Sequence, residues 1–206
     1  MHTTANPVPA QATAGQPASP AWTWLALVAA AAASVGSLYL SLPEQWGVKW
    51  GMNLKACPLC FYERTFALSV FGVLVIGLCT KAWRSGALSL LALPLAIGGL
   101  GVAIFHVYLE LKGTLECPGG IGNVGTAPKQ SLAILAVIVV LLGIDSLRNR
   151  AAGQFGLPVW IGSILLGVLF TVGAVASAPP MPPAPAKAYD PEKQPLDGCR
   201  PAFHET

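Results

Sequence analysis

The feature that most constrains this chain is a series of five apolar stretches, each close to the length needed to cross a membrane. A bilayer core about 30 Å thick is crossed by roughly 20 mostly apolar residues in a helix. The stretches are residues 22–42, 61–80, 87–109, 129–147 and 157–178. None alternates apolar and polar residues, as membrane strands do. The sequence therefore predicts an all-α integral membrane protein, a bundle of four to five transmembrane helices.

Composition supports the same class of protein. Only 10% of the residues are charged and 54% are hydrophobic, whereas soluble domains carry about 25% charged residues. This excludes an ordinary soluble enzyme, and the apolar content excludes disorder throughout the chain. The net charge of +3 comes with no basic cluster, so no nucleic acid partner is expected.

The two ends differ from the apolar middle. Residues 1–20 contain no Lys or Arg and are predicted to form a disordered leader, since a cleavable signal peptide begins with basic residues. Residues 21–178 form the transmembrane bundle. Residues 179–206 form a Pro-rich extracytoplasmic tail that carries Cys199. Its first part, residues 179–186, is typical of a semi-rigid spacer that holds the rest away from the membrane surface.

The cysteines segregate to one face of the membrane. With five spans, the loops after the first and third spans share a face with the tail. Four cysteines fall there, and Cys79 alone falls at the other face; the four are Cys57, Cys60, Cys117 and Cys199. Lys and Arg totals near the two faces are equal, but their density in the short loops after the second and fourth spans favours those loops as cytoplasmic. The four cysteines are then extracytoplasmic, where disulfides persist.

Cys57 and Cys60 form a C-x-x-C motif where the second apolar stretch begins. One thiol pKa is commonly lowered in such motifs, and the helix dipole favours a thiolate at Cys60. Arg64 follows one turn later on the same helix face, where its cation can stabilise a thiolate or an anionic cofactor. Glu63 points about 100° away on a helix and is a less natural partner for Cys60.

Other uses of the cysteines are less well supported. A c-type haem needs His directly after the second cysteine, where Phe61 stands. A Cys₄ zinc site remains an alternative, but Cys117 and Cys199 are 82 positions apart and thiols in an oxidising compartment tend to pair. Redox chemistry is favoured and no metal ligands are expected. Cys79 is expected to be a small packing residue.

The run from Cys57 to Arg64, C-P-L-C-F-Y-E-R, resembles the C-x-x-C-x-Y-E-R signature of the bacterial disulfide-bond-formation protein B (DsbB) family. The resemblance covers residues 22–150. It implies a quinone-dependent thiol oxidoreductase of the bacterial inner membrane with a four-helix redox core. Such a protein takes electrons from a periplasmic thioredoxin-like oxidase (DsbA-like) and passes them to ubiquinone or menaquinone. Cys57 and Cys60 would lie next to the quinone, with Cys60 in contact with it and Arg64 holding it.

The sequence departs from the family in its second cysteine pair. Family members carry that pair in the loop between the third and fourth spans and end after the fourth span. Here the loop holds only Cys117, and its expected partner is Cys199, beyond an extra fifth span that returns the tail to the same face. This departure leaves two candidates, Cys117 and Cys199, for attack by the soluble partner; Cys117 is assigned by its position in the loop, and exchange with Cys57 and Cys60 follows.

One further candidate and one alternative function complete the prediction. His106 ends the third span on the cysteine-bearing face, where it either bonds a quinone carbonyl or is an interfacial histidine with a structural partner. The alternative function is a non-catalytic membrane protein whose cysteines hold structural zinc or brace loops.

Overall fold

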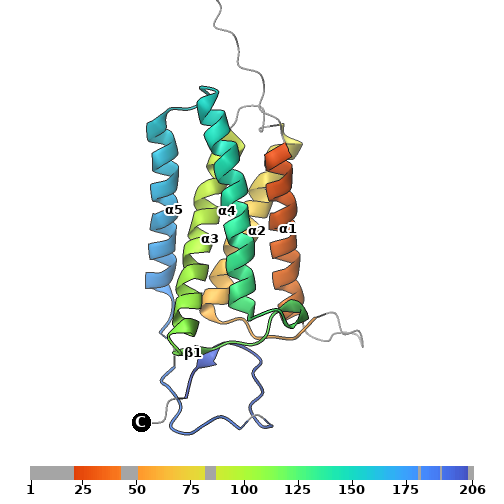
Figure 1. The fold of residues 1–206 in the computed structure, drawn as a ribbon, viewed down its shortest axis with the longest axis vertical. Helices are drawn as coiled ribbons and strands as arrows, with labels where there is room; N and C mark the ends of the chain where they lie inside the picture. The colour runs from red at the N-terminus through yellow and green to blue at the C-terminus, as the bar shows by residue number, and fades with distance from the viewer. Residues whose placement is uncertain (1–20, 43–50, 82–86, 181, 191, 204–206) are drawn as a thin grey trace, which may run out of the picture.

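The computed structural model describes residues 21–42, 51–81, 87–180, 182–190 and 192–203; the expected leader, residues 1–20, lies outside these ranges. Within them, five helices are long and apolar enough to cross a membrane (Figure 1). They are α1 (Ala21–Ser41), α2 (Pro58–Cys79), α3 (Ala87–Leu111), α4 (Ala127–Ala151) and α5 (Leu157–Ser177). The predicted class, a helical integral membrane bundle, is confirmed.

The helices form a four-helix bundle with one helix added outside. α1 packs on α2, α2 on α3, α3 on α4, and α4 returns to α1, which closes the ring. α5 packs mainly against α3 and hardly touches α4 (Figure 1). The arrangement agrees with the expected four-helix core plus one extra span.

The apolar run of α4 is shorter than a full span because polar residues occupy both ends of the helix. Thr126 is its N-cap and Pro128 lies in its first turn, while Lys129 forms a 2.9 Å ion pair with Glu110 of α3. At the other end the buried Asp145 accepts a 3.2 Å hydrogen bond from Thr23 of α1. Polar residues at both ends of α4 therefore face neighbouring helices, and the helix is longer than its apolar segment.

α5 docks on α3 through small residues and the hydroxyl groups of Ser163 and Thr171. Pro94 inside α3 has no N–H, so the carbonyl of Leu90 loses its helical partner. The hydroxyl of Ser163 in α5 donates a 3.0 Å hydrogen bond to that carbonyl. Gly101 is needed for the close approach, because a Cβ there would lie 2.2 Å from Oγ1 of Thr171.

The tail folds back across the end of the bundle. Its strand β2 (Arg200–Pro201) pairs antiparallel with β1 (Leu115–Glu116), which follows α3 (Figure 1). The Asp197 carbonyl accepts a 2.5 Å hydrogen bond from the Lys55 amide, and the two side chains form a 2.7 Å ion pair. Backbone pairing and ion pairs therefore draw residues 197–202 onto the end of the bundle that carries β1.

Candidate active site

The C-x-x-C motif is built on the first turn of α2. Cys57 is the N-cap residue in an extended conformation, and its sulfur accepts a 3.2 Å hydrogen bond from the Cys60 amide. The two free thiols lie 2.8 Å apart, within hydrogen-bond distance of each other. Pro58 starts the helix and needs no amide partner in that position. The turn thus places both sulfurs at the helix N-terminus.

The charge of the reduced pair falls on Cys57. The hydrogen bond from the Cys60 thiol, helped by contacts with His106, lowers the pKa of Cys57 from 9.0 to about 4, although burial opposes the shift. The sequence favoured Cys60 as the thiolate because of the helix dipole. The N-cap position explains the difference, since the Cys57 sulfur accepts the hydrogen bond from the Cys60 amide.

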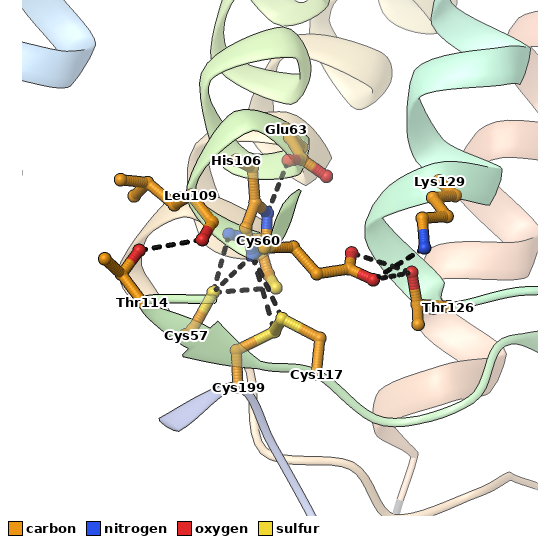
Figure 2. The surroundings of a disulfide bond; sticks show 11 residues. Cys57, Cys60, Glu63, His106, Leu109, Thr114, Cys117, Thr126, Lys129 and Cys199 are labelled. Carbon is orange, nitrogen blue, oxygen red and sulfur yellow. Dashed lines mark hydrogen bonds and ion pairs between the residues drawn. A yellow bond between two sulfur atoms is a disulfide. The ribbon is translucent and has the colours of Figure 1, made fainter. Parts of the chain in front are cut away.

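His106 of α3 lies between the two cysteine pairs (Figure 2). Its ring is fully buried, and its Nε2 atom lies 3.8 Å from Cys57, 3.5 Å from Cys117 and 3.4 Å from Cys199, measured to each sulfur. Its Nδ1 atom lies 2.8 Å from Oε1 of the buried Glu63. A buried imidazole oriented by a carboxylate is a group that can accept and return protons.

Glu63 is the site residue that sequence reasoning missed. Its hydrogen-bond partner lies not on α2 but on another helix, α3. The available signal was the presence of two ionisable groups, Glu63 and His106, near the same end of two apolar spans. Such groups usually pair inside a membrane bundle.

Cys117 and Cys199 form a disulfide between the α3–α4 loop and the tail (Figure 2). Cys117 directly follows β1 and Cys199 directly precedes β2, so the short antiparallel pair brings them together. Arg200 adds a 3.4 Å ion pair with Glu116 beside the bond. This pairing removes two of the four thiols that a Cys₄ zinc site would require.

The two cysteine pairs lie within reach of each other. The sulfurs of Cys57, Cys60 and Cys199 and a ring nitrogen of His106 all lie within 4.8 Å of one another. Cys79 is exposed at the C-terminal end of α2, away from this cluster. The structure thus brings together all four cysteines expected at the site.

A cavity of about 220 Å³ lies on the other side of Cys60, between α1, α2 and α4. Cys60, Glu63 and Arg64 supply polar groups from α2, and Gln130 supplies one from α4. The remaining wall is mostly apolar and includes Ala32, Ala33, Leu40, Ala67, Ile121, Ile134 and Leu135. His106 does not line this cavity; its Nε2 atom faces the sulfurs.

Arg64 is held at the cavity by α1. Its guanidinium donates a 3.0 Å hydrogen bond to the Ser37 carbonyl and a second bond to the Ser41 hydroxyl. Its Nε–H group is buried with no partner among the described residues. An apolar cavity with one unpaired donor and a thiol at its wall fits a small apolar molecule that carries a hydrogen-bond acceptor, such as a quinone ring.

A second cavity, of about 460 Å³, opens on the far side of the sulfurs. Cys57 and Cys199 both line it, together with Phe105 of α3, Val175 of α5 and Pro201 of the tail. The cysteine cluster therefore separates two apolar cavities, one reached by Cys60 and the other by Cys57 and Cys199.

A membrane helical bundle with a disulfide and a dithiol in contact defines a membrane thiol–disulfide oxidoreductase. Similarity to known proteins supports the same class. The family model for disulfide bond formation protein DsbB matches residues 19–134. A probable disulfide formation protein of Chlamydia trachomatis is 31% identical over 102 residues, which cover 44% of this chain and 73% of that protein. No solved structure matches significantly.

The chain belongs to the DsbB family and is a membrane disulfide-bond formation protein. The match ends inside α4, so α5 and the tail with Cys199 lie beyond the matched region.

Proposed function

We propose that this protein reoxidises a soluble periplasmic thioredoxin-like thiol oxidase and passes the electrons to ubiquinone or menaquinone. The carrying observation is the contact between the two cysteine pairs at one end of the bundle, with Cys60 at the wall of an apolar cavity. Family membership supports the oxidoreductase chemistry. The alternative, in which the cysteines only brace loops, gives the free thiols of Cys57 and Cys60 no role.

The first half of the reaction takes place at the outer disulfide. A thiolate of the reduced partner attacks the Cys117 sulfur, the Cys117–Cys199 bond breaks, and the electron pair leaves on Cys199. Cys199 then attacks Cys57 of the oxidised inner pair, from which it is at most 4.8 Å away. A Cys57–Cys199 bond forms and the electron pair leaves on Cys60, beside the cavity.

The second half of the reaction re-forms the Cys117–Cys199 disulfide. The partner's remaining thiolate attacks its own mixed disulfide, which releases the oxidised partner and a Cys117 thiolate. Cys117 attacks Cys199, so that the Cys117–Cys199 bond forms again and Cys57 leaves as a thiolate. Two electrons and two protons have moved from the partner dithiol to the Cys57–Cys60 dithiol.

His106, oriented by Glu63, accepts and returns the protons of these thiol–disulfide exchanges. With Nδ1–H donating to the Glu63 carboxylate, the Nε2 lone pair of a neutral ring is directed at the sulfurs. A thiol of Cys117 or Cys199 can pass its proton to Nε2 before attack, and a leaving thiolate can take it back. Positioned general bases contribute about 10²- to 10⁴-fold to such steps.

The quinone would be held in the 220 Å³ cavity. Arg64 offers its unpaired Nε–H to an acceptor on the ring, and the apolar walls from α1 and α4 exclude water. When bound, the quinone supplies a two-electron acceptor for the Cys57–Cys60 dithiol. Cys60 lines the cavity and Cys57 does not, so Cys60 is the thiol placed to deliver the electrons.

The orientation proposed is that of the bacterial inner membrane, with the cysteine end and tail periplasmic and the N-terminus cytoplasmic. Lys81 follows the end of α2, and Arg148 and Arg150 lie in the last turn of α4, both opposite the cysteines. Arg148 and Arg150 lie over the rings of Trp22 and Trp160 at that end, 5.5 and 6.0 Å from the ring centres. Basic residues beside span ends favour the cytoplasmic side.

The test is turnover of a reduced thioredoxin-like oxidase by the purified full-length protein with a water-soluble quinone analogue. Cys60→Ser should abolish quinone reduction and Cys199→Ala should block turnover with the protein partner, while Cys79→Ser leaves both unchanged. Solvent extraction of the purified protein should release a quinone. Normal turnover by Cys199→Ala would show that the Cys117–Cys199 disulfide only braces the structure. It would contradict the proposed transfer between the two cysteine pairs.

The order of attack has its own test. A partner that lacks its second active-site cysteine should stop as a mixed disulfide, which peptide mass spectrometry locates. The bond is expected on Cys117, because Cys199 is the sulfur within reach of Cys57. A bond on Cys199 would reverse the order.

A further inference from the structure

The same cluster contains donor atoms that a metal ion can use once the outer disulfide is open. One ring nitrogen of His106 and the sulfurs of Cys57, Cys60 and Cys199 all lie within 4.8 Å of one another. Three thiolates and an imidazole make a Cys₃His set, which is a tetrahedral zinc donor set. The Cys₄ set considered from the sequence is different, because it takes Cys117 and leaves His106 out.

The distances suit a tetrahedral ion. Zinc bonds of about 2.3 Å to sulfur and 2.0 Å to nitrogen place sulfurs about 3.8 Å apart and sulfur and nitrogen about 3.5 Å apart. His106 Nε2 lies 3.4 Å from the Cys199 sulfur and 3.8 Å from the Cys57 sulfur. Cys57 and Cys60, 2.8 Å apart, must separate by about 1 Å to bind zinc.

The surroundings of His106 match those of a metal-bound histidine. Metal-ligating imidazoles usually donate their second N–H to a carboxylate, which fixes the ring and raises its basicity. Glu63 occupies that place, with Oε1 2.8 Å from Nδ1 of a fully buried ring. The N-terminus of α2 adds a favourable field for an anionic cluster of three thiolates and one zinc ion.

We propose that the fully reduced protein binds one Zn²⁺ ion through Cys57, Cys60, Cys199 and His106, and that the oxidised protein does not. Disulfide sulfurs are not thiolate ligands, so the Cys117–Cys199 bond must be reduced first. Reduction by a dithiol supplies the two electrons, and zinc binding then displaces the thiol protons without further redox change. Bound zinc holds three of the four redox thiols and stops turnover reversibly.

The experiment uses the full-length protein in detergent, reduced and freed of reductant without oxygen. After incubation with Zn²⁺ and gel filtration, elemental analysis should find about one zinc per reduced chain and almost none per oxidised chain. Co²⁺ in place of zinc should give the intense visible bands of a tetrahedral ion with thiolate ligands. Absence of zinc from the reduced protein would overturn the proposal and leave the oxidoreductase function untouched.

Matched variants identify the ligands. Cys117→Ser and Cys199→Ser remove the same disulfide, but only Cys199→Ser should lose zinc. His106→Gln should lose zinc, and His106→Cys should regain it with an altered Co²⁺ spectrum. Glu63→Gln should weaken binding about 10- to 100-fold, as loss of such a supporting carboxylate does. Zinc that is retained by Cys199→Ser, or lost from Cys117→Ser, would exclude the proposed ligand set.

Discussion

At the scale of single residues, Cys57 has the clearest chemical signature. Its pKa, lowered to about 4 by the hydrogen bond from Cys60, keeps it a thiolate through the neutral range in the reduced protein. Its alkylation by iodoacetamide should therefore stay nearly constant from pH 8 to about pH 5 and decline as pH falls through about 4. Mass spectrometry of the Cys57 peptide at a series of pH values measures the rate.

Two controls accompany this prediction. Cys79 is an exposed free thiol outside the hydrogen-bonded cysteine pair, so alkylation of its peptide in the same samples is the internal reference. Cys60→Ala removes the donor thiol and should raise the pKa of Cys57. If Cys57 follows the same profile as Cys79, the hydrogen bond does not control its charge.

The dyad of His106 and Glu63 predicts a kinetic effect. His106→Gln should slow electron transfer from the outer to the inner pair by about 10²-fold, because no base remains beside the sulfurs. Glu63→Gln keeps a hydrogen-bond acceptor and should slow it less, with a shifted pH profile. Stopped-flow oxidation of a reduced partner measures the rate. Unchanged rates with unchanged pH profiles would leave the dyad a structural role only.

The sequence could predict the cysteines but not their neighbours. The spacing of Cys57 and Cys60 and the odd number of spans placed all four redox cysteines on one face. The contact of His106 with Glu63 depends on how α2 and α3 are rotated against each other, and the weak amphipathicity of membrane spans does not encode this. The sequence therefore left His106 either at a quinone carbonyl or with a structural partner, and in the fold its ring lies between Glu63 and the sulfurs.

At the scale of elements, the docking of α5 on α3 is the feature that hydropathy alone does not determine. The five spans can be predicted from the length of the apolar stretches. Which helices pack together depends on small residues and on a carbonyl that lacks its helical donor. Pro94, Gly101 and Ser163 are individually unremarkable in sequence. Together they let two helices approach and share a hydrogen bond.

Ser163→Ala tests this docking. The Leu90 carbonyl, already deprived of a helical donor by Pro94, would lose its remaining side-chain partner, so the free energy of unfolding should fall by about 1 kcal/mol. Unfolding by sodium dodecyl sulfate in mixed micelles, followed by circular dichroism, measures the change.

Thr80→Ala is the matched control for Ser163→Ala. It removes a hydroxyl bonded at 2.8 Å to the Ile76 carbonyl within exposed α2 backbone, where water can replace the donor. Its cost should be within about 0.5 kcal/mol of zero. Equal effects of the two variants would mean that the Leu90 contact does not hold α5.

At the scale of the whole molecule, the two ends of the bundle should be chemically distinguishable across a membrane. Cys79 lies at the end opposite the other four cysteines. A membrane-impermeant maleimide should label Cys79 in inverted inner-membrane vesicles and the reduced Cys57 and Cys199 in intact spheroplasts. Labelling of Cys79 from the outside would reverse the orientation proposed from the basic loops.

The path of the tail also determines the covalent connectivity of the whole chain. The bond between Cys117 and Cys199 joins residues 82 positions apart and closes a covalent ring that contains α4 and α5. In the proposed cycle each turnover opens this ring and closes it again, so the chain alternates between a form closed by the Cys117–Cys199 bond and forms in which that bond is open. A single protease cut within the ring leaves the oxidised chain in one piece but divides the reduced chain in two. The integrity of the molecule therefore depends on its redox state.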